Sequence, residues 1–251
     1  TNSDDIREYR LRGPFLYGLN RITRNLTFSL ARGFVVPSHE LSDLLFPRHD
    51  RPICVISNGI DFGKIEPLPP TDHKTPVITL VGSQGMKWHG VDKLVKLAEL
   101  YPDILVNIVG YTHQDMNMPI PPNMHLHGFL EGDQLRKVLA TTDVVCGSLA
   151  LHRNHLREAS PLKVREAIAL GIPVIIAYED TDLYDISVDT ILRIPNTEDN
   201  VVANAESIRE FAYRMIGRRI DVEAFALRLD QRNKEIARLA FFHKILADFG
   251  A

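Results

Sequence analysis

The sequence predicts an α/β protein built on a doubly wound parallel sheet, and two features of its pattern carry that prediction. Short apolar runs without polar alternation, such as residues 77–81 and 174–176, are typical of strands that are buried on both faces. Helical segments of about ten residues separate these runs, as in the βαβ units of parallel sheets. Ligands of such sheets bind beyond the carboxyl ends of the strands, so the loops that follow the apolar runs are candidate sites.

The first sixty residues predict a partial Rossmann-like segment. Residues 14–31 have helical periodicity, with apolar side chains on one broad face: Leu16, Leu19, Ile22, Leu26 and Leu30. A strand at 34–36, a short helix at 40–46 capped by Ser38, and a strand at 53–56 are expected to follow. Residues 61–76 are rich in proline and carry little periodicity, so we interpret them as a linker.

A repeating pattern of strands and helices begins at residue 77. The predicted elements are strand 77–81, helix 91–100, strand 105–109, strand 124–126, helix 132–140, strand 143–146, helix 161–170 and strand 174–176. Residues beyond 200 are predicted to be helical, with the last long helix over 225–249. We therefore divide the chain into residues 1–60, a linker at 61–76, a ligand-binding domain at 77–200 and C-terminal helices at 201–251.

Composition narrows the classes of function. The chain has 251 residues, of which 45% are hydrophobic and 24% charged, as is ordinary for a globular protein. Its net charge of −3 does not favour binding to nucleic acid or to an anionic membrane. Cys54 and Cys146 lie in apolar runs without metal or disulfide spacing, which favours a reduced, cytoplasmic protein. No apolar run reaches the roughly 18 residues of a membrane-spanning helix.

The start of the predicted helix 161–170 is a candidate anion site. Ser160 is a good N-cap, and Pro161 suits the first helical position, where its missing N–H is not needed. The free N–H groups near Leu162 and Lys163, together with the helix dipole, would attract an anion, and Lys163 adds a formal charge. Gly171 suits the C-terminal cap of the same helix.

Two glutamates flank this helix start, Glu158 in the loop before it and Glu166 one to two turns into it. A phosphate at the helix tip would have one carboxylate on either side. That arrangement suits a nucleotide-sugar, with sugar hydroxyls at one end and ribose hydroxyls at the other. The spacing alone leaves another interpretation open, namely an ordinary capped helix with two solvated carboxylates.

Other short motifs occur in a fixed order around this stretch. They are N-G-I-D at 58–61, G-S-Q-G-M-K-W-H-G-V-D at 82–92, I-V-G at 108–110, H-G-F-L at 127–130 and T-D-V at 142–144. With the E-x7-E spacing of Glu158 and Glu166, they resemble the signature of family 4 retaining glycosyltransferases of the GT-B fold (glycosyl transferases group 1). Residues 2–41 resemble the last third of that family's N-terminal domain. The resemblance implies a GT-B-type Rossmann-like sheet, with a donor-binding domain at 77–200 and a remnant of the acceptor domain at 1–60.

The resemblance also implies roles for particular residues. Glu158 would orient the donor sugar and is the candidate catalytic residue, and Glu166 would bind the ribose. Many family members carry Arg where this chain has Ser83 and Lys where it has His89, so the diphosphate contacts are expected to rest on Lys87, His89, Lys163 and the helix N-terminus. The expected nucleotide-sugar contacts are Gly82, Ser83, Lys87, His89, Gly90, Gly110, Phe129, Leu130, Ser160, Pro161, Leu162, Lys163 and Glu166.

The implied activity is transfer of a sugar from a UDP- or GDP-sugar to a hydroxyl of a glycan or lipid-linked acceptor, with retention, in glycan or polysaccharide biosynthesis. No metal and no other cofactor is expected. The chain by itself would be inactive if its acceptor domain is incomplete. Two alternatives stay open: a nucleotide-sugar epimerase on the same scaffold, and a non-catalytic nucleotide-sugar-binding fragment.

Some polar clusters fit less specific interpretations. Asp180-Thr181-Asp182 matches the D-x-D metal motif of the other glycosyltransferase fold, but its surroundings do not match that fold, so we do not expect a metal there. Arg153 and Arg157 could contact phosphate or acceptor, although a solvated face is the simpler interpretation. The helix at 14–31 could place a cytoplasmic protein peripherally at a membrane, and packing within the N-terminal domain explains its apolar face equally well.

Overall fold

The computed structural model describes residues 13–45 and 51–250, so the start of the segment 2–41 and the end of the predicted helix 40–46 lie outside the described residues. The chain divides into two compact units. One comprises residues 1–57 and 234–251, and the other comprises residues 58–233. The predicted linker 61–76 lies within the second unit, where Leu68 is buried and its N–H donates to the carbonyl of Leu170.

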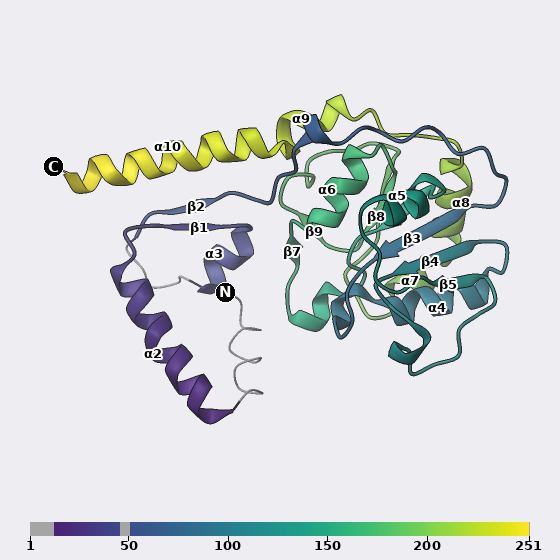
Figure 1. Cartoon of the computed structure of the whole chain (residues 1–251), viewed down its shortest axis with the longest axis horizontal. Coiled ribbons are helices and arrows are strands. Elements are labelled where there is room, and N and C mark those ends of the chain that lie inside the picture. Colours follow the sequence, from purple (N-terminus) through teal and green to yellow (C-terminus); the bar gives the residue numbers. More distant parts are fainter. Residues whose placement is uncertain (1–12, 46–50, 251) are drawn as a thin grey trace. The chain divides into compact units, whose positions relative to one another are not determined.

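The second unit is built on a six-stranded parallel sheet, of which Figure 1 labels β3, β4, β5 and β8. The strand order is β10-β8-β6-β3-β4-β5. Its strands are β3 (Val77–Val81), β4 (Leu105–Val109), β5 (Met124–Leu126), β6 (Val144–Cys146), β8 (Val174–Ile176) and β10 (Ile191–Arg193). Strand order reverses at β3, because β4 and β5 add to one side of it and β6, β8 and β10 to the other. This arrangement confirms the predicted doubly wound parallel sheet and places a topological switch point between β3 and β6.

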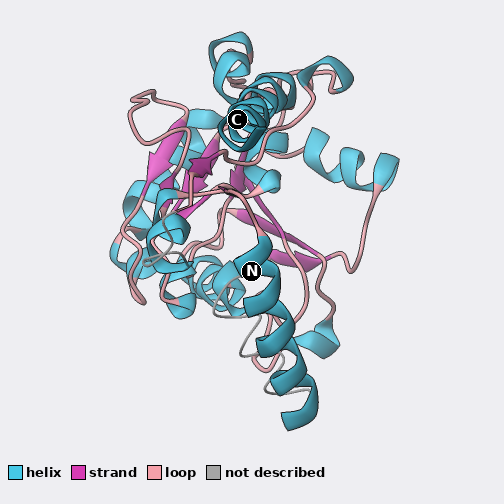
Figure 2. Cartoon of the chain, turned by 90° about the vertical axis from the view of Figure 1, so that its left-hand side faces the viewer, coloured by secondary structure: helices cyan, strands magenta, loops and turns pink. Residues whose placement is uncertain are grey.

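Helices cover the sheet in two groups (Figure 2). Those of the second unit are α4 (Val91–Leu100), α5 (Gly132–Ala140), α6 (Leu162–Ala169), α7 (Asn200–Ala203), α8 (Ala205–Met215) and α9 (Glu223–Leu229). Buried side chains of α4, α7 and α8 join one core with alternate residues of the strands, such as Ile78 and Leu80. Helix α6 packs against β6, β8 and α9.

A small two-stranded sheet stands beside the main one. It joins β7 (Glu158–Ala159) to β9 (Glu179–Asp180) in parallel, with Glu158 opposite Glu179. Glu158 was expected in a loop and instead lies in this short strand, because the N–H of Glu179 donates to the carbonyl of Arg157.

The first unit contains α2 (Pro14–Leu30), β1 (Phe34–Val36), α3 (His39–Leu45) and β2 (Ile53–Val55). Strands β1 and β2 pair in parallel, and Phe34 and Val36 form a small buried core with Phe28 and Ile53. The predicted helix 14–31 is confirmed as α2, and its apolar face is exposed at Leu16, Leu19, Ile22, Leu26 and Leu30. Within the described ranges, every helix is too short or too polar to cross a bilayer.

The C-terminal helix differs from its prediction. Instead of one helix over 225–249, the chain forms α9 and then α10 (Gln231–Gly250), with Asp230 extended between them. The backbone of Ile60 pairs at this break: its N–H donates to the carbonyl of Leu229, and its carbonyl accepts from the N–H of Gln231. A tertiary backbone contact therefore divides a segment whose periodicity predicts one helix.

Candidate functional site

The carboxyl ends of β3 and β4 meet at two glycines. Gly82 follows β3, and its N–H donates to the carbonyl of Val109 over 3.0 Å. Gly110 follows β4 with φ +93°, and a Cβ at this position would lie only 2.0 Å from the carbonyl oxygen of Gly82. Only glycine can occupy position 110 in this backbone. Both predicted site residues therefore line the same edge of the sheet, next to the switch point.

The loop after β3 is held by backbone contacts. It contains the 3-10 turn η2 (Lys87–His89) and ends at Gly90, which has φ +73° and lies at the N-terminus of α4. The carbonyl of His89 accepts from the N–H of Leu149, over 3.2 Å. The hydroxyl of Tyr111 donates to the carbonyl of Ser83 over 2.6 Å. The side chain of Lys87 is exposed beside this fixed loop.

An arginine that was predicted to lie on a solvated face holds this loop in place. The guanidinium of Arg153 binds both carboxylate oxygens of Asp92, over 2.8 and 2.7 Å, and donates to the carbonyl of Lys87 over 3.1 Å. It also pairs with the carboxylate of Glu198. The prediction for Arg153 was wrong because its partners lie in three other segments. In the sequence, the carboxylate of Asp92 in the G-V-D motif was the one signal that pointed to a partner for Arg153.

The start of α6 differs in detail from its prediction. Leu162 is the first helical residue, and Pro161 takes the N-cap position, so the helix begins one residue later than predicted. The hydroxyl of Ser160 accepts from the backbone N–H of Asn58 over 3.2 Å, and the Asn58 side chain donates to the carbonyl of Ser160 over 2.8 Å. The N-G-I-D turn thus positions the tip of α6. Gly171, with φ +80°, follows the last turn as predicted.

Lys163 points back into the molecule. Its ammonium donates to the carbonyl of Val81 over 3.2 Å and lies 2.9 Å from Nδ1 of His89. Burial lowers the pKa of Lys163 to about 7, and burial together with repulsion from Lys163 lowers the pKa of His89 to about 3. His89 is therefore neutral. We infer that its Nδ1 accepts from the ammonium, so that Nε2 carries the ring proton.

Glu166 shares a helix face with Lys163 because the two are three residues apart. Its carboxylate is half-buried, makes no hydrogen bond or ion pair with any described residue, and has its pKa raised by burial. A part-desolvated carboxylate without a partner is unusual and is a candidate ligand for hydroxyl groups. Glu158 lies at the other end of the segment in β7, also half-buried.

The loop after β5 forms a further border of the site. Gly128 has φ +65°, and its carbonyl accepts from the N–H of Gly110 over 2.6 Å. Phe129, next along the chain, is 80% exposed, and Leu130 is half-buried. Backbone contacts thus connect Gly82, Gly110 and Gly128 in sequence along the sheet edge.

The Asp180-Thr181-Asp182 motif is an ion-pair site. The buried guanidinium of Arg165 binds the carboxylate of Asp180 with two nitrogens and that of Asp182 over 2.8 Å. Its Nε also donates to the carbonyl of Asn58 over 3.2 Å. Both carboxylates are therefore committed to a cation of the protein. Within residues 13–45 and 51–250, no group of three or more metal-binding side chains is present.

Comparisons with known proteins bear on the family and the fold. The family model described as "Glycosyl transferases group 1" matches residues 64–184. No curated protein sequence matches the chain. The computed structure is similar to sucrose-phosphate synthase from Thermosynechococcus elongatus, at 16% identity and a TM-score of 0.62, over 87% of this chain and 59% of that one.

Two further solved structures have the same fold. The lipopolysaccharide outer core galactosyltransferase WaaB, in its apo form, matches with a TM-score of 0.63 and 14% identity, over 86% of this chain and 63% of that one. HepE from Anabaena, in complex with UDP-glucose, matches with a TM-score of 0.59 and 18% identity, over 88% and 66%. The chain thus spans less than two thirds of the length of each of these proteins. Residues 64–184 therefore match the model of the glycosyl transferases group 1 family, and the sheet has the GT-B fold of these glycosyltransferase structures.

Proposed function

We propose that this chain carries the donor-binding part of a retaining glycosyltransferase that takes its sugar from a nucleoside diphosphate. The observation that carries the proposal is Lys163, a desolvated cation without an acidic partner among the described residues, held at the switch point of the sheet. Family membership supports sugar transfer and does not favour the epimerase alternative. The UDP-glucose in the Anabaena structure supports a uridine donor.

The diphosphate is assigned to the space between the tip of α6 and the loop after β3. Free N–H groups at Leu162 and Lys163 begin the helix, and His89 offers an Nε2–H donor from the facing loop. Lys163 supplies the charge, because binding a phosphate oxygen would replace its contact with the neutral imidazole. Glycine at positions 82 and 110 lets the ends of β3 and β4 and the His89 side chain approach closely at this edge.

The two glutamates are assigned to the two ends of the donor. Glu166 would accept hydrogen bonds from the ribose hydroxyls, and Glu158 would hold the sugar hydroxyls. The exposed ring of Phe129 and the backbone of Leu130 would border the base. Lys87, exposed on the same loop as His89, would add a second positive charge near the diphosphate.

In the proposed reaction, the bond between the anomeric carbon and the diphosphate oxygen breaks, and its electron pair stays on the diphosphate. The acceptor oxygen forms its bond to the same face of the anomeric carbon, and the acceptor proton passes to the leaving phosphate. Fixed N–H groups and Lys163 stabilise the negative charge that develops on the leaving group. The acceptor is proposed to be a glycan or lipid-linked hydroxyl, bound with help from the rest of a longer protein.

Calorimetric titration of the full chain with UDP, GDP and UDP-glucose tests the assignment. We expect Glu166→Ala to weaken UDP binding by about 10- to 100-fold, the range for hydrogen bonds to a charged group. Glu158→Ala should leave UDP affinity unchanged and weaken the added contribution of the sugar. Glu99→Ala, at an exposed position of α4, is the matched control. Failure of the unmodified chain to bind any nucleotide would contradict the proposal.

A further inference from the structure

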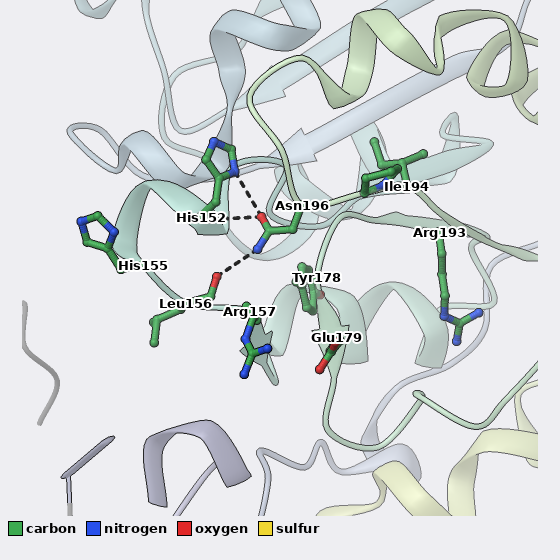
Figure 3. Close-up of a pocket in the computed structure, with 10 residues that line it drawn as sticks. His152, His155, Leu156, Arg157, Tyr178, Glu179, Arg193, Ile194 and Asn196 are labelled. Carbon is green, nitrogen blue, oxygen red and sulfur yellow. Dashed lines mark hydrogen bonds between the residues drawn. The ribbon is translucent and has the colours of Figure 1, made fainter. Parts of the chain in front are cut away.

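A pocket lies outside the residues assigned to the donor. It has a volume of about 560 Å³ and opens at the carboxyl ends of β8 and β10, beside the segment that leads from η4 (Leu151–Asn154) to β7. Figure 3 shows its side chains. It is lined by His152, His155, Leu156, Arg157, Tyr178, Glu179, Arg193, Ile194, Pro195 and Asn196. A cavity of this size is typical of a small-ligand site.

The position of the pocket relates it to Glu158. Along the sheet, the loop after β3, which borders the proposed diphosphate site, lies on one side of β6, and β8 and β10 lie on the other side. Arg157 immediately precedes Glu158, and Glu179 pairs with Glu158 in register across β7 and β9. The pocket therefore adjoins the proposed sugar-binding glutamate, on the side away from the diphosphate.

The chemistry of the lining is divided between an apolar wall and a basic rim. Leu156, Tyr178 and Ile194 are buried and form the wall. His155, Arg157 and Arg193 are exposed at the rim, where Glu179 is the one acidic side chain of the lining. A sugar ring presents apolar faces to such a wall, and guanidinium groups favour carboxylate or phosphate oxygens. The combination suits a sugar that carries an anionic substituent.

The wall is held by side-chain hydrogen bonds before any ligand arrives. The side-chain oxygen of Asn196 accepts from the backbone N–H of His152 over 3.0 Å, and its amide nitrogen donates to the carbonyl of Leu156 over 2.9 Å (Figure 3). His152 also lies 2.8 Å from a carboxylate oxygen of Glu198, the residue that pairs with Arg153. Such prior ordering reduces the entropy cost of binding.

The turn at His155 is strained. His155 has φ +56° and is the one non-glycine residue with positive φ within residues 13–45 and 51–250. Histidine is enriched among the few residues that adopt this conformation, which is unfavourable for a residue with a Cβ. Here it ends η4, and its imidazole belongs to the pocket lining but points away from Tyr178 (Figure 3). Strain of this kind concentrates at ligand sites.

We propose that this pocket binds an acidic sugar of the acceptor, a hexose bearing a carboxylate or a phosphate, and so selects an anionic glycan. The inference rests on the proposed function, which places the donor sugar at Glu158 and leaves the adjoining pocket for the acceptor. Arg193 is the principal rim cation: one guanidinium nitrogen donates to the carbonyl of Leu183 over 2.6 Å and orients the group.

The test uses the full chain with saturating UDP, so that the donor phosphate site is filled. Glucuronate, glucose 6-phosphate and glucose are titrated in turn, and binding is followed by ligand-observed saturation-transfer NMR. We expect at least one acidic sugar to bind at least tenfold more tightly than glucose. Preference for glucuronate would identify a carboxylate ligand, and preference for glucose 6-phosphate a phosphate ligand. Equal binding of all three sugars, or no binding, would overturn the proposal.

Variants of residues that line the pocket test whether the acidic sugar binds there. Arg193→Gln should weaken the preferred acidic sugar about tenfold or more and leave UDP affinity unchanged, whereas the exposed Arg214→Gln is the matched control. His155→Gly keeps the backbone turn and removes the imidazole, so weaker binding by this variant supports a direct contact. An unchanged affinity in both Arg193→Gln and His155→Gly would overturn the assignment to this pocket.

The outcomes also separate this inference from the proposed function. UDP binding without any acidic-sugar binding would overturn the pocket alone. Binding of acidic sugar by a chain that binds no nucleotide would contradict the proposed transferase function, and would still support the pocket as a sugar site. Lys163→Met should weaken UDP and leave acidic-sugar affinity unchanged, which shows that the sugar does not occupy the donor phosphate site.

Discussion

Two cations of helix α6, two residues apart, are withdrawn from water in opposite ways. Arg165 is fully buried and meets two carboxylates, those of Asp180 and Asp182. Lys163 meets a neutral imidazole and a backbone carbonyl, with no carboxylate partner among the described residues. The same helix therefore presents one compensated charge toward β9 and one uncompensated charge toward the end of β3.

The pKa directions follow from this difference. Attraction by Asp180 and its hydrogen bonds outweigh the burial of Arg165, so the pKa of its guanidinium is raised. Burial is not offset at Lys163, and its pKa falls to about 7. A buried charge with its counter-ion is part of the scaffold, whereas a buried charge without one stores a desolvation cost that an anionic ligand can relieve. The contrast supports a structural role for Arg165 and a ligand-binding role for Lys163.

The largest expected effect tests the proposed structural role of Arg165. Arg165→Met strands the buried carboxylate of Asp180 and removes the contact with the carbonyl of Asn58, so we expect the free energy of unfolding to fall by about 3–5 kcal/mol. Urea denaturation followed by circular dichroism measures the change. Lys96→Met, at an exposed position of α4, should alter stability by less than about 0.5 kcal/mol. Equal stability of the two variants would mean that the Arg165 ion pairs do not support the fold.

The second-largest expected effect tests the proposed ligand-binding role of Lys163. Lys163→Met removes a desolvated charge, so we expect unchanged or higher stability together with UDP binding weaker by about 10- to 100-fold. Lys163→Met would then lose UDP affinity without losing stability, whereas Arg165→Met loses stability. Calorimetry with UDP and urea denaturation of the same preparation provide both numbers. A stability loss as large as that of Arg165→Met would remove the distinction between the two cations.

The pH dependence of UDP binding sharpens the assignment. A bound diphosphate favours the charged ammonium, so binding raises the pKa of Lys163 from about 7 and takes up a proton when the pH is higher. We therefore expect UDP affinity to fall as pH rises from 7 to 9, by at most about tenfold per pH unit. Lys163→Met should lose this dependence. A pH profile that is the same in both proteins would assign the titration to another group.

The smallest expected effect concerns the hydroxyl group of Tyr178. The hydroxyl of Tyr178 is buried without a hydrogen-bond partner among the described residues, and a Cβ at Gly147 would lie 3.1 Å from it. Burial raises the pKa of Tyr178 well above 10, so the group stays neutral. Tyr178→Phe removes an unsatisfied hydroxyl, and we expect stability to be unchanged or raised by up to about 1 kcal/mol in urea denaturation. A loss of more than about 1 kcal/mol would show that the hydroxyl has a partner after all.

Local patterns predicted the elements but not the polar contacts between them. The runs that form β3, β4 and β8 are apolar except for Thr79 and Asn107, and Gly110 and Gly171 mark positions where φ is positive. These features depend on neighbours within a few residues. Arg153 and Asp92 are 61 residues apart, and Lys163 and His89 are 74 apart, so their pairing depends on strand order. The same limit explains why the break at Asp230 and the short strand β7 were missed.

The sequence by itself determined the fold class, the five strands β3, β4, β5, β6 and β8 of the main sheet, and the residues that stand at the carboxyl ends of β3, β4 and β5, whereas β7, β9 and β10 were not predicted. It could do so because burial on both faces and backbone conformation impose local chemical patterns. Only the tertiary structure decided which of the two α6 cations is neutralised, which arginine holds the loop after β3, and that a basic-rimmed pocket adjoins Glu158. Those outcomes depend on distances between segments that lie far apart along the chain, because electrostatic and hydrogen-bond energies change over a few ångströms.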